Sequence, residues 1–203
     1  MHKILVTCFE PFGNYSDNSS RAVAEKMVDL HLEGVAIEQM PVSFQRVAAA
    51  FNKAIEKHQP EVIIMLGQSS LATAVKLERV ALNLMDSSKG DSDGYKPDEV
   101  PIHHGEHEAL FTTLPIKKLH QALLQKNIQA TISNSCGLYV CNTLYYEALR
   151  RCLEGTMKAL FVHLPLYDGQ PVTNSRTQTR PLDEMIQAVV TIITTIYDTR
   201  NDI

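Results

Sequence analysis

SNSCGLYVCN, residues 133–142, has the pattern of a strand that ends, a glycine turn, and a helix that begins around a cysteine. Residues 131 and 132 are β-branched, so we expect a short strand that ends near Ser133. Gly137 permits the tight turn. Apolar residues then recur at helical spacing, which places Cys141 on the buried face and in the first turn of a helix. The helix dipole and the unpaired N–H groups of a first turn favour the thiolate form of a cysteine.

Outward from this stretch, apolar runs alternate with helical patterns along the chain. EVIIML at 61–66 and KALFVHL at 158–164 have no polar face and predict central strands that are buried on both sides. Further strands are expected at 3–8 and 35–42, and helices at 19–32, 43–58, 115–126 and after Pro181. The last helix has a broad apolar stripe, which indicates core packing or a subunit contact. The pattern predicts an α/β fold, a three-layer α/β/α sandwich around a twisted, mostly parallel sheet.

Composition limits the function classes. A chain of 203 residues with 44% hydrophobic and 21% charged residues predicts one domain spanning 1–203. The net charge is −4 and the basic residues are scattered, so we expect no nucleic-acid partner. No apolar run is long enough to span a membrane, and residues 1–8 lack the features of a signal peptide, so a cytoplasmic protein with free thiols is expected.

Alternation over residues 73–85 predicts an extended segment on which Glu78 shares a face with Val80, Leu82 and Leu84. A carboxylate on an apolar face is costly unless a cation or a hydrogen-bond donor meets it. Lys76 and Arg79 are the neighbouring candidates for this partner. Alternation directs Arg79 to the opposite face, however, which leaves room for a histidine.

The ligand crevice of an open parallel sheet lies at the carboxyl ends of its strands, where Gly67, Cys141, His163 and the 9–13 loop are expected to gather. Taken singly, a cysteine in an apolar helix or a histidine beside a buried strand is more often structural than catalytic. Together, a carboxylate, an imidazole and a thiol are the groups needed for acyl transfer through a thioester. Backbone N–H groups around Cys141 would stabilise the oxyanion.

Two other segments have alternative interpretations. Residues 89–105 predict turns or a hairpin, and HHGEH at 103–107 fits the HxxEH pattern of a metal-dependent peptidase, with His103, Glu106 and His107 as the candidate residues. That motif requires a helix, whereas Pro101 and Gly105 indicate a turn, so a solvated loop is favoured and no metal is expected. Residues 166–180 suit either a lid over a ligand or a plain surface loop. A nucleoside-binding or phosphorylase-like protein on the same scaffold would need a glycine-rich phosphate loop, which the sequence lacks.

The chain resembles the pyroglutamyl peptidases, which are cytoplasmic cysteine peptidases that remove an N-terminal pyroglutamate. Four segments carry the resemblance: VTCFEPFG at 6–13, GQSS with LERVALN at 67–83, SNSCGLYVCN at 133–142, and FVHLPL at 161–166. The resemblance implies Glu78, Cys141 and His163 as the catalytic residues, no cofactor, and a homo-oligomer, a dimer or a tetramer. Its implied partners are peptides with a blocked pyroglutamyl N-terminus.

The resemblance also implies a substrate pocket. Its implied walls and contacts are Phe9, Phe12, Gln68, Tyr139 and Val140. Such a pocket suits a neutral five-membered lactam, because the ring favours aromatic walls and the amide needs a donor and an acceptor. The chain departs from the family at 88–92, where SKGDS replaces an arginine followed by IPDN, and at Ser69, Ser70, Lys76, Cys136 and Tyr139. These departures leave a related acyl-amide hydrolase with an altered acyl preference as the alternative function.

Overall fold

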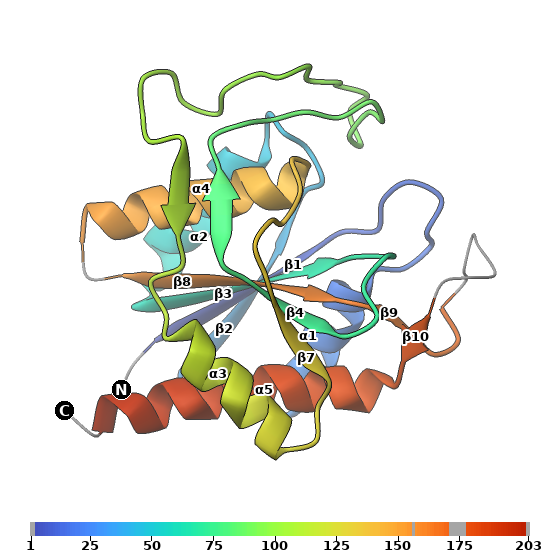
Figure 1. Ribbon diagram of the computed structural model, residues 1–203, viewed down its shortest axis with the longest axis vertical. Helices are drawn as coiled ribbons and strands as arrows, with labels where there is room; N and C mark the ends of the chain where they lie inside the picture. Colours follow the sequence, from blue (N-terminus) through green and yellow to red (C-terminus); the bar gives the residue numbers. More distant parts are fainter. Residues whose placement is uncertain (1–2, 156, 171–177, 202–203) are drawn as a thin grey trace.

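The computed structural model describes residues 3–155, 157–170 and 178–201. A six-stranded sheet lies at the centre, with the strand order β2-β1-β3-β8-β4-β7. Figure 1 shows α2 and α4 on one face of this sheet and α1, α3 and α5 on the other. Because only the pair β4 and β8 is antiparallel within this sheet, the three-layer sandwich with a mostly parallel sheet is confirmed.

The elements follow the predicted alternation of strands and helices. The strands are β1 (Ile4–Phe9), β2 (Val35–Met40), β3 (Val62–Gln68), β4 (Val75–Glu78), β5 (Val80–Leu82), β6 (Ala109–Phe111), β7 (Ala130–Ser133), β8 (Lys158–Leu164), β9 (Leu166–Tyr167) and β10 (Thr179–Arg180). The helices are α1 (Ser19–Asp29), α2 (Val47–His58), α3 (Ile116–Gln125), α4 (Val140–Leu153) and α5 (Leu182–Asn201).

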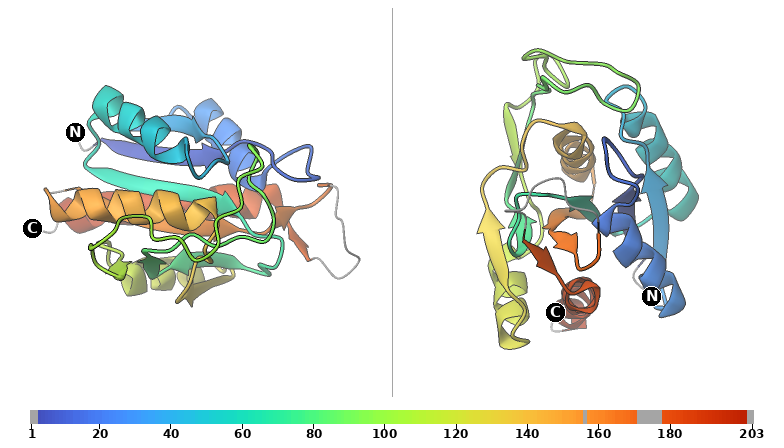
Figure 2. Two further views of the ribbon diagram at one scale, coloured as in Figure 1. Left: turned by 90° about the horizontal axis from the view of Figure 1, so that it is seen from above. Right: turned by 90° about the vertical axis from the view of Figure 1, so that its right-hand side faces the viewer.

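Each face of the sheet has its own hydrophobic core. Alternate residues of β1, β3 and β8 pack against α1, α3 and α5 on one side, and the intervening residues pack against α2 and α4 on the other. Figure 2 shows the helices on both sides of the sheet. Strands β3 and β8 are buried along almost their whole length, as their continuous apolar runs predicted. The apolar stripe of α5 packs into the first core, in agreement with its interpretation as core packing.

The extended segment predicted over 73–85 is divided between two sheets. Strand β4 belongs to the central sheet, whereas β5 pairs antiparallel with β6 in a separate two-stranded sheet beside α4 (Figure 1). The break falls at Arg79, whose N–H donates to the Ser133 carbonyl and whose carbonyl accepts from the N–H of Thr112. The single shared face of Glu78, Val80 and Leu82 was therefore wrong.

Three local predictions also need correction. Ser43 Oγ accepts from the Arg46 N–H, as the predicted cap would, but residues 44–46 form a turn and helix α2 begins only at Val47. Helix α4 is buried on nearly all sides, and Cys141 is one of its partly exposed residues rather than part of a single buried stripe. Residues 166–180, expected to be a lid or a plain surface loop without regular structure, contain β9 and β10, and residues 171–177 of this segment lie outside the described residues.

Candidate active site

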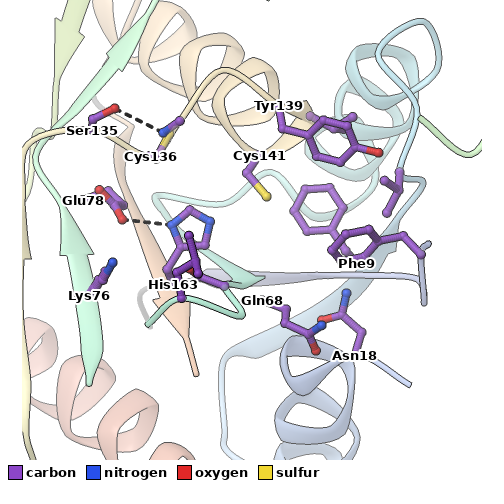
Figure 3. A pocket seen from close by; sticks show the side chains of 16 residues that line it. Phe9, Asn18, Gln68, Lys76, Glu78, Ser135, Cys136, Tyr139, Cys141 and His163 are labelled. Atoms are coloured by element: carbon purple, nitrogen blue, oxygen red, sulfur yellow. Dashed lines mark hydrogen bonds and ion pairs between the residues drawn. The ribbon is translucent and has the colours of Figure 1, made fainter. Parts of the chain in front are cut away.

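One face of the central sheet forms the base of the site. Gly67 of β3 is level with His163 of β8, and Lys76 of β4 is level with His163 on its other side. Glu78 is opposite Phe161, so Glu78 and His163 are diagonal neighbours across the antiparallel pair of strands. Their side chains project on the α4 side of the sheet, toward the cysteine of that helix (Figure 3).

Glu78 and His163 form a buried pair. His163 Nδ1 lies 2.9 Å from Glu78 Oε1, and the two residues are 7% and 1% exposed, His163 first. A carboxylate can only accept, so Nδ1 carries the proton of this hydrogen bond and Nε2 of a neutral imidazole is left as a base. The predicted cation partners do not pair with Glu78, because Arg79 turns away to donate from Nε to Asn134 Oδ1 and no ion pair of Lys76 is found among the described residues.

Cys141 enters the site from the start of α4. Gly137 has φ +79°, which a residue with a side chain rarely adopts, and the turn it forms leads through Tyr139, the N-cap, into the helix. Asn142 then ties the first turn to β5, because its Nδ2 donates to the carbonyls of Leu82 and Leu84 and its Oδ1 accepts from the Leu82 N–H. The thiol is thus attached to a buried and rigid helix start.

Gly67 leaves room for the thiol. A Cβ at this position would lie 3.2 Å from Cys141 Sγ and 2.7 Å from Cζ of Phe161. Phe161 is fully buried and its ring packs against His163, with the ring centroids 4.8 Å apart. A glycine is therefore required where the thiol, the imidazole and β3 meet.

The acidity of the Cys141 thiol differs from the expectation drawn from its helix position. Burial, reinforced by the negative charge of Glu78, raises the pKa of Cys141 from 9.0 to about 12. The thiol is consequently protonated at neutral pH. Its proton has to leave as the thiol attacks, and this makes a neighbouring base necessary.

Aromatic and aliphatic side chains wall a cavity of about 260 Å³ above these groups. Phe12 contacts Tyr139 with ring centroids 6.1 Å apart, and Phe44 supports Tyr139 from behind at 5.3 Å. Phe9 and Val140 are almost completely buried. The cavity therefore offers apolar walls to a small ring.

Gln68 supplies a buried polar contact in this cavity. Its Oε1 accepts from the Ser19 N–H at 2.8 Å and from Gln170 Nε2 at 2.7 Å. Its Nε2 is buried and has no hydrogen-bond partner among the described residues. A ligand with a carbonyl oxygen would satisfy this N–H group.

The cavity brings together all eight residues singled out in the sequence: Phe9, Phe12, Gln68, Glu78, Tyr139, Val140, Cys141 and His163. It also contains residues that were not predicted to line the site. Asn18, the N-cap of α1, had a capping signal but no ligand signal, and Lys76 was noted only as a neighbour of Glu78 and a departure from the family. The additional lining residues are Asn18, Val42, Ser69, Leu71, Lys76, Ser135, Cys136 and Gly137.

Residues 89–92, within the segment that departs from the family, line a second cavity of about 750 Å³ that adjoins the first. The two cavities share Phe12, Gln68 and Tyr139 among their walls. The Tyr139 hydroxyl donates to the Gly90 carbonyl at 3.3 Å, a bond that a phenylalanine could not make. Two of the departures from the family are thus in direct contact.

The metal-peptidase alternative does not fit the geometry of residues 103–107. This segment is made of turns and bends, whereas the HxxEH pattern places its ligands on a helix. His103 Nε2 lies 2.7 Å from Glu147 Oε1, and Glu106 lies near Arg150. Within the part of the chain that the structure describes, no cluster of three His, Cys, Asp or Glu side chains could hold a metal ion.

Known proteins match the chain along nearly its whole length. The sequence profile of the pyroglutamyl peptidases matches residues 2–199. The pyrrolidone-carboxylate peptidase of Thermococcus onnurineus is 36% identical over 197 residues, covering 95% of this chain and 98% of its own, and that of Vibrio campbellii is 33% identical over 205 residues, covering 100% and 96%. The solved pyrrolidone carboxyl peptidase of Thermococcus litoralis superposes with a TM-score of 0.92 at 29% identity, covering 100% of this chain and 96% of its own.

A thiol, an imidazole and a carboxylate at one cavity of an α/β sandwich are the groups of a cysteine peptidase, and this is the class of the protein. The chain belongs to the pyroglutamyl peptidase family, as its four motif segments predicted. No helix among its described residues has the length and apolar character needed to cross a membrane.

Proposed function

We propose that Cys141, His163 and Glu78 carry out the reaction of this family in this chain, the removal of an N-terminal pyroglutamyl residue by thiol acyl transfer. The observation that carries the proposal is the buried hydrogen bond between Glu78 and His163. Both residues line the same cavity as Cys141. Each group comes from a different element, so the arrangement depends on the whole sandwich. Residues 1–203 would then act as one peptidase domain.

In the first step His163 Nε2 takes the thiol proton as Cys141 Sγ attacks the carbonyl of the pyroglutamyl residue. Glu78 holds the imidazole through Nδ1 and stabilises the imidazolium that forms. The N–H groups of Val140 and Cys141 have no helical partner at the start of α4, and they would stabilise the oxyanion together with the helix dipole.

The tetrahedral intermediate collapses when His163 returns the proton to the leaving amine, which breaks the peptide bond and leaves a thioester on Cys141. Water then attacks the thioester with His163 as the base. The released products are pyroglutamate and a peptide shortened by one residue. The raised pKa of Cys141 fits this sequence, because the proton is still on sulfur when the substrate arrives.

Recognition of the acyl group would use the aromatic walls and Gln68. The pyroglutamyl ring is neutral, so it can enter a cavity in which a free amino terminus would lose its hydration. Gln68 Nε2, which has no partner among the described residues, would donate to the lactam carbonyl. Phe9, Phe12, Tyr139 and Val140 would contact the ring.

Release of a fluorescent amine from pyroglutamyl and prolyl amides tests this proposal. We expect cleavage of the pyroglutamyl amide, and a fall in kcat of about 10³-fold or more in Cys141→Ala. Cys152→Ser is the matched control, because Cys152 is a buried thiol at the far end of the same helix and outside the cavity. Cys136→Ser is also expected to stay active.

Full activity in Cys141→Ala would contradict the mechanism. Preferential cleavage of another acyl amide would favour the alternative hydrolase, for which the contact between Tyr139 and Gly90 is the specific observation. Activity that is lost with a metal chelator but not with a thiol-alkylating reagent would favour the metal-dependent alternative.

The proposal extends to the state of the protein in the cell. We infer a cytoplasmic homo-oligomer, a dimer or a tetramer, on the basis of the family resemblance. Phe111 and Leu153 are large apolar side chains that are more than half exposed, and a subunit contact would remove such surface from water. Light scattering coupled to size-exclusion chromatography would give the mass, and a monomer at micromolar concentration would contradict this inference.

A further inference from the structure

Gln170 is a buried residue that contacts the side chain of Gln68 but does not itself line the cavity. It follows β9 in a turn that contains Gly169, and it is 3% exposed. Its Nε2 donates to the Asp17 carbonyl at 3.1 Å and to Gln68 Oε1 at 2.7 Å, and its Oε1 accepts from the Tyr167 N–H at 3.2 Å. Three hydrogen bonds thus hold an amide behind the residue that supplies the polar contact of the site.

Backbone groups fix the orientation of both amides. A carbonyl can only accept, so the atom of Gln170 that faces Asp17 is the NH₂ group, and the atom that faces the Tyr167 N–H is the oxygen. The Ser19 N–H can only donate, so the atom of Gln68 beside it is the oxygen. The NH₂ group of Gln170 donates to the same oxygen, which makes the assignment consistent along the chain of contacts.

These contacts determine which end of the Gln68 amide is left for a ligand in the cavity. With Oε1 of Gln68 held by two donors, its Nε2 is the group that remains, and this N–H group is buried without a partner among the described residues. A reversed amide would leave the Ser19 N–H and the NH₂ group of Gln170 facing a third donor. Because a buried donor that faces another donor loses its hydrogen bond to water without gaining a new one, the reversed orientation is strongly disfavoured.

We propose that Gln170 is a positioning residue that makes the cavity present a hydrogen-bond donor, and so selects acyl rings that carry a carbonyl oxygen. The inference rests on the proposed function for the identity of the ring. It assigns to Gln170 no contact with the substrate. Its action passes through Gln68, whose position in Figure 3 is beside Asn18 and on the other side of His163 from Glu78.

Neighbouring side chains anchor Gln170 to the start of α1. The Tyr167 hydroxyl donates to Asp17 Oδ2 at 2.6 Å, and Arg21 binds the Asp17 carboxylate at 2.8 Å. The Asp17 carboxylate therefore accepts hydrogen bonds from Tyr167 and Arg21, and its backbone carbonyl accepts one from Gln170. The segment after β9 and the start of α1 are held together at the back of Gln68.

The test uses binding as well as turnover. Gln170→Glu keeps the acceptor for the Tyr167 N–H but replaces the NH₂ group with a carboxylate oxygen beside Gln68 Oε1. In a Cys141→Ala background, binding of a pyroglutamyl peptide measured by calorimetry is expected to weaken about 10- to 100-fold. Gln170→Met, which removes all three hydrogen bonds without a charge, is expected to weaken it in the same direction. Gln121→Glu, the same change on the exposed side of α3, is the matched control.

A double-mutant cycle separates positioning from general loss of structure. If Gln170 acts through Gln68, then Gln170→Glu weakens binding by less than about twofold once Gln68→Met is present. An equal effect in both backgrounds overturns the proposal, as does unchanged binding in both Gln170 variants. Thermal unfolding of each variant identifies a misfolded protein, in which case the remaining Gln170 variant decides.

In the active enzyme the same change is expected to raise KM about 10- to 100-fold while kcat changes by less than about threefold. A wild-type chain that binds the lactam but does not cleave it would contradict the proposed function and leave the role of Gln170 intact. A lactam that does not bind to the Cys141→Ala protein overturns the inference on Gln170.

Discussion

Substitution of Gly67 by alanine tests whether the base of the site depends on the absence of a side chain on β3. The new methyl group would lie 2.7 and 2.8 Å from two ring atoms of Phe161 and 3.2 Å from Cys141 Sγ. The Phe161 ring cannot yield freely, because it is fully buried and packs against Phe9, Tyr145 and His163.

Two effects of this substitution can be separated. Overpacking of this kind costs about 1–3 kcal/mol of stability. At about 2–4 °C per kcal/mol for a chain of this size, the melting temperature should fall by about 2–12 °C. Any shift of Phe161 also moves the imidazole that it contacts, and a misplacement of about 1 Å lowers the rate about 100-fold.

The assay combines thermal unfolding with kcat for a fluorogenic pyroglutamyl amide, measured at a temperature at which the variant is fully folded. Gly155→Ala is the control, because nothing among the described residues lies within 4 Å of the position that its Cβ would occupy. It is expected to leave kcat unchanged. A Gly67→Ala protein with both wild-type stability and wild-type kcat would refute the crowding expected between the new methyl group, Phe161 and Cys141.

Three further experiments have predicted outcomes. Glu78→Gln should fold and bind substrate normally but lower kcat about 10²- to 10⁴-fold, since an amide cannot offset the imidazolium charge; equal rates would return Glu78 to a structural role. Alkylation of Cys141 by a small neutral reagent, followed by mass spectrometry, should accelerate about tenfold per pH unit from about pH 7 to 10, because the raised pKa keeps the thiolate a minor species over that range. A plateau at neutral pH would instead indicate a preformed ion pair with His163. Asn142→Ala should lower the free energy of unfolding by about 2–4 kcal/mol in denaturant titrations, because it leaves backbone groups of Leu82 and Leu84 unpaired; a loss below about 0.5 kcal/mol would contradict this.

The sandwich could be predicted because its central strands have a strong signal. A run such as EVIIML at 61–66 can be accommodated only where both faces are covered, and helices alternate with such runs along the chain. Alternation turned Arg79 away from Glu78 correctly but did not reveal the break there, because a period of two does not show which sheet the next residues join. Strand β6 and the antiparallel direction of β4 depend on such long-range pairing, and neither was predicted.

The residues of the site were predicted from motifs. The raised pKa of the Cys141 thiol and the orientation of the Gln68 amide were not. Cys141 at a helix start and His163 at a strand end carry local signals, and the resemblance supplied the residues that wall the cavity. The acidity of the thiol depends on burial and on Glu78, which is 63 positions away in the chain. The orientation of Gln68 depends on Gln170 and Ser19, which no local pattern connects to it.

Because β4 and β8 pair within the central sheet, the site has two regions that we expect to differ in their free energy of local opening. Glu78 and His163 belong to hydrogen-bonded strands inside the central sheet, where we expect amide hydrogens to exchange only through global unfolding. Phe9 and Gln68 also belong to this sheet, but much of the remaining wall comes from connecting segments that contain Phe12, Ser69, Leu71 and residues 135–139, where we expect local opening at lower free energy. On warming, binding of the acyl ring should therefore weaken before Glu78 and His163 lose their alignment. KM should then rise at temperatures at which kcat still increases.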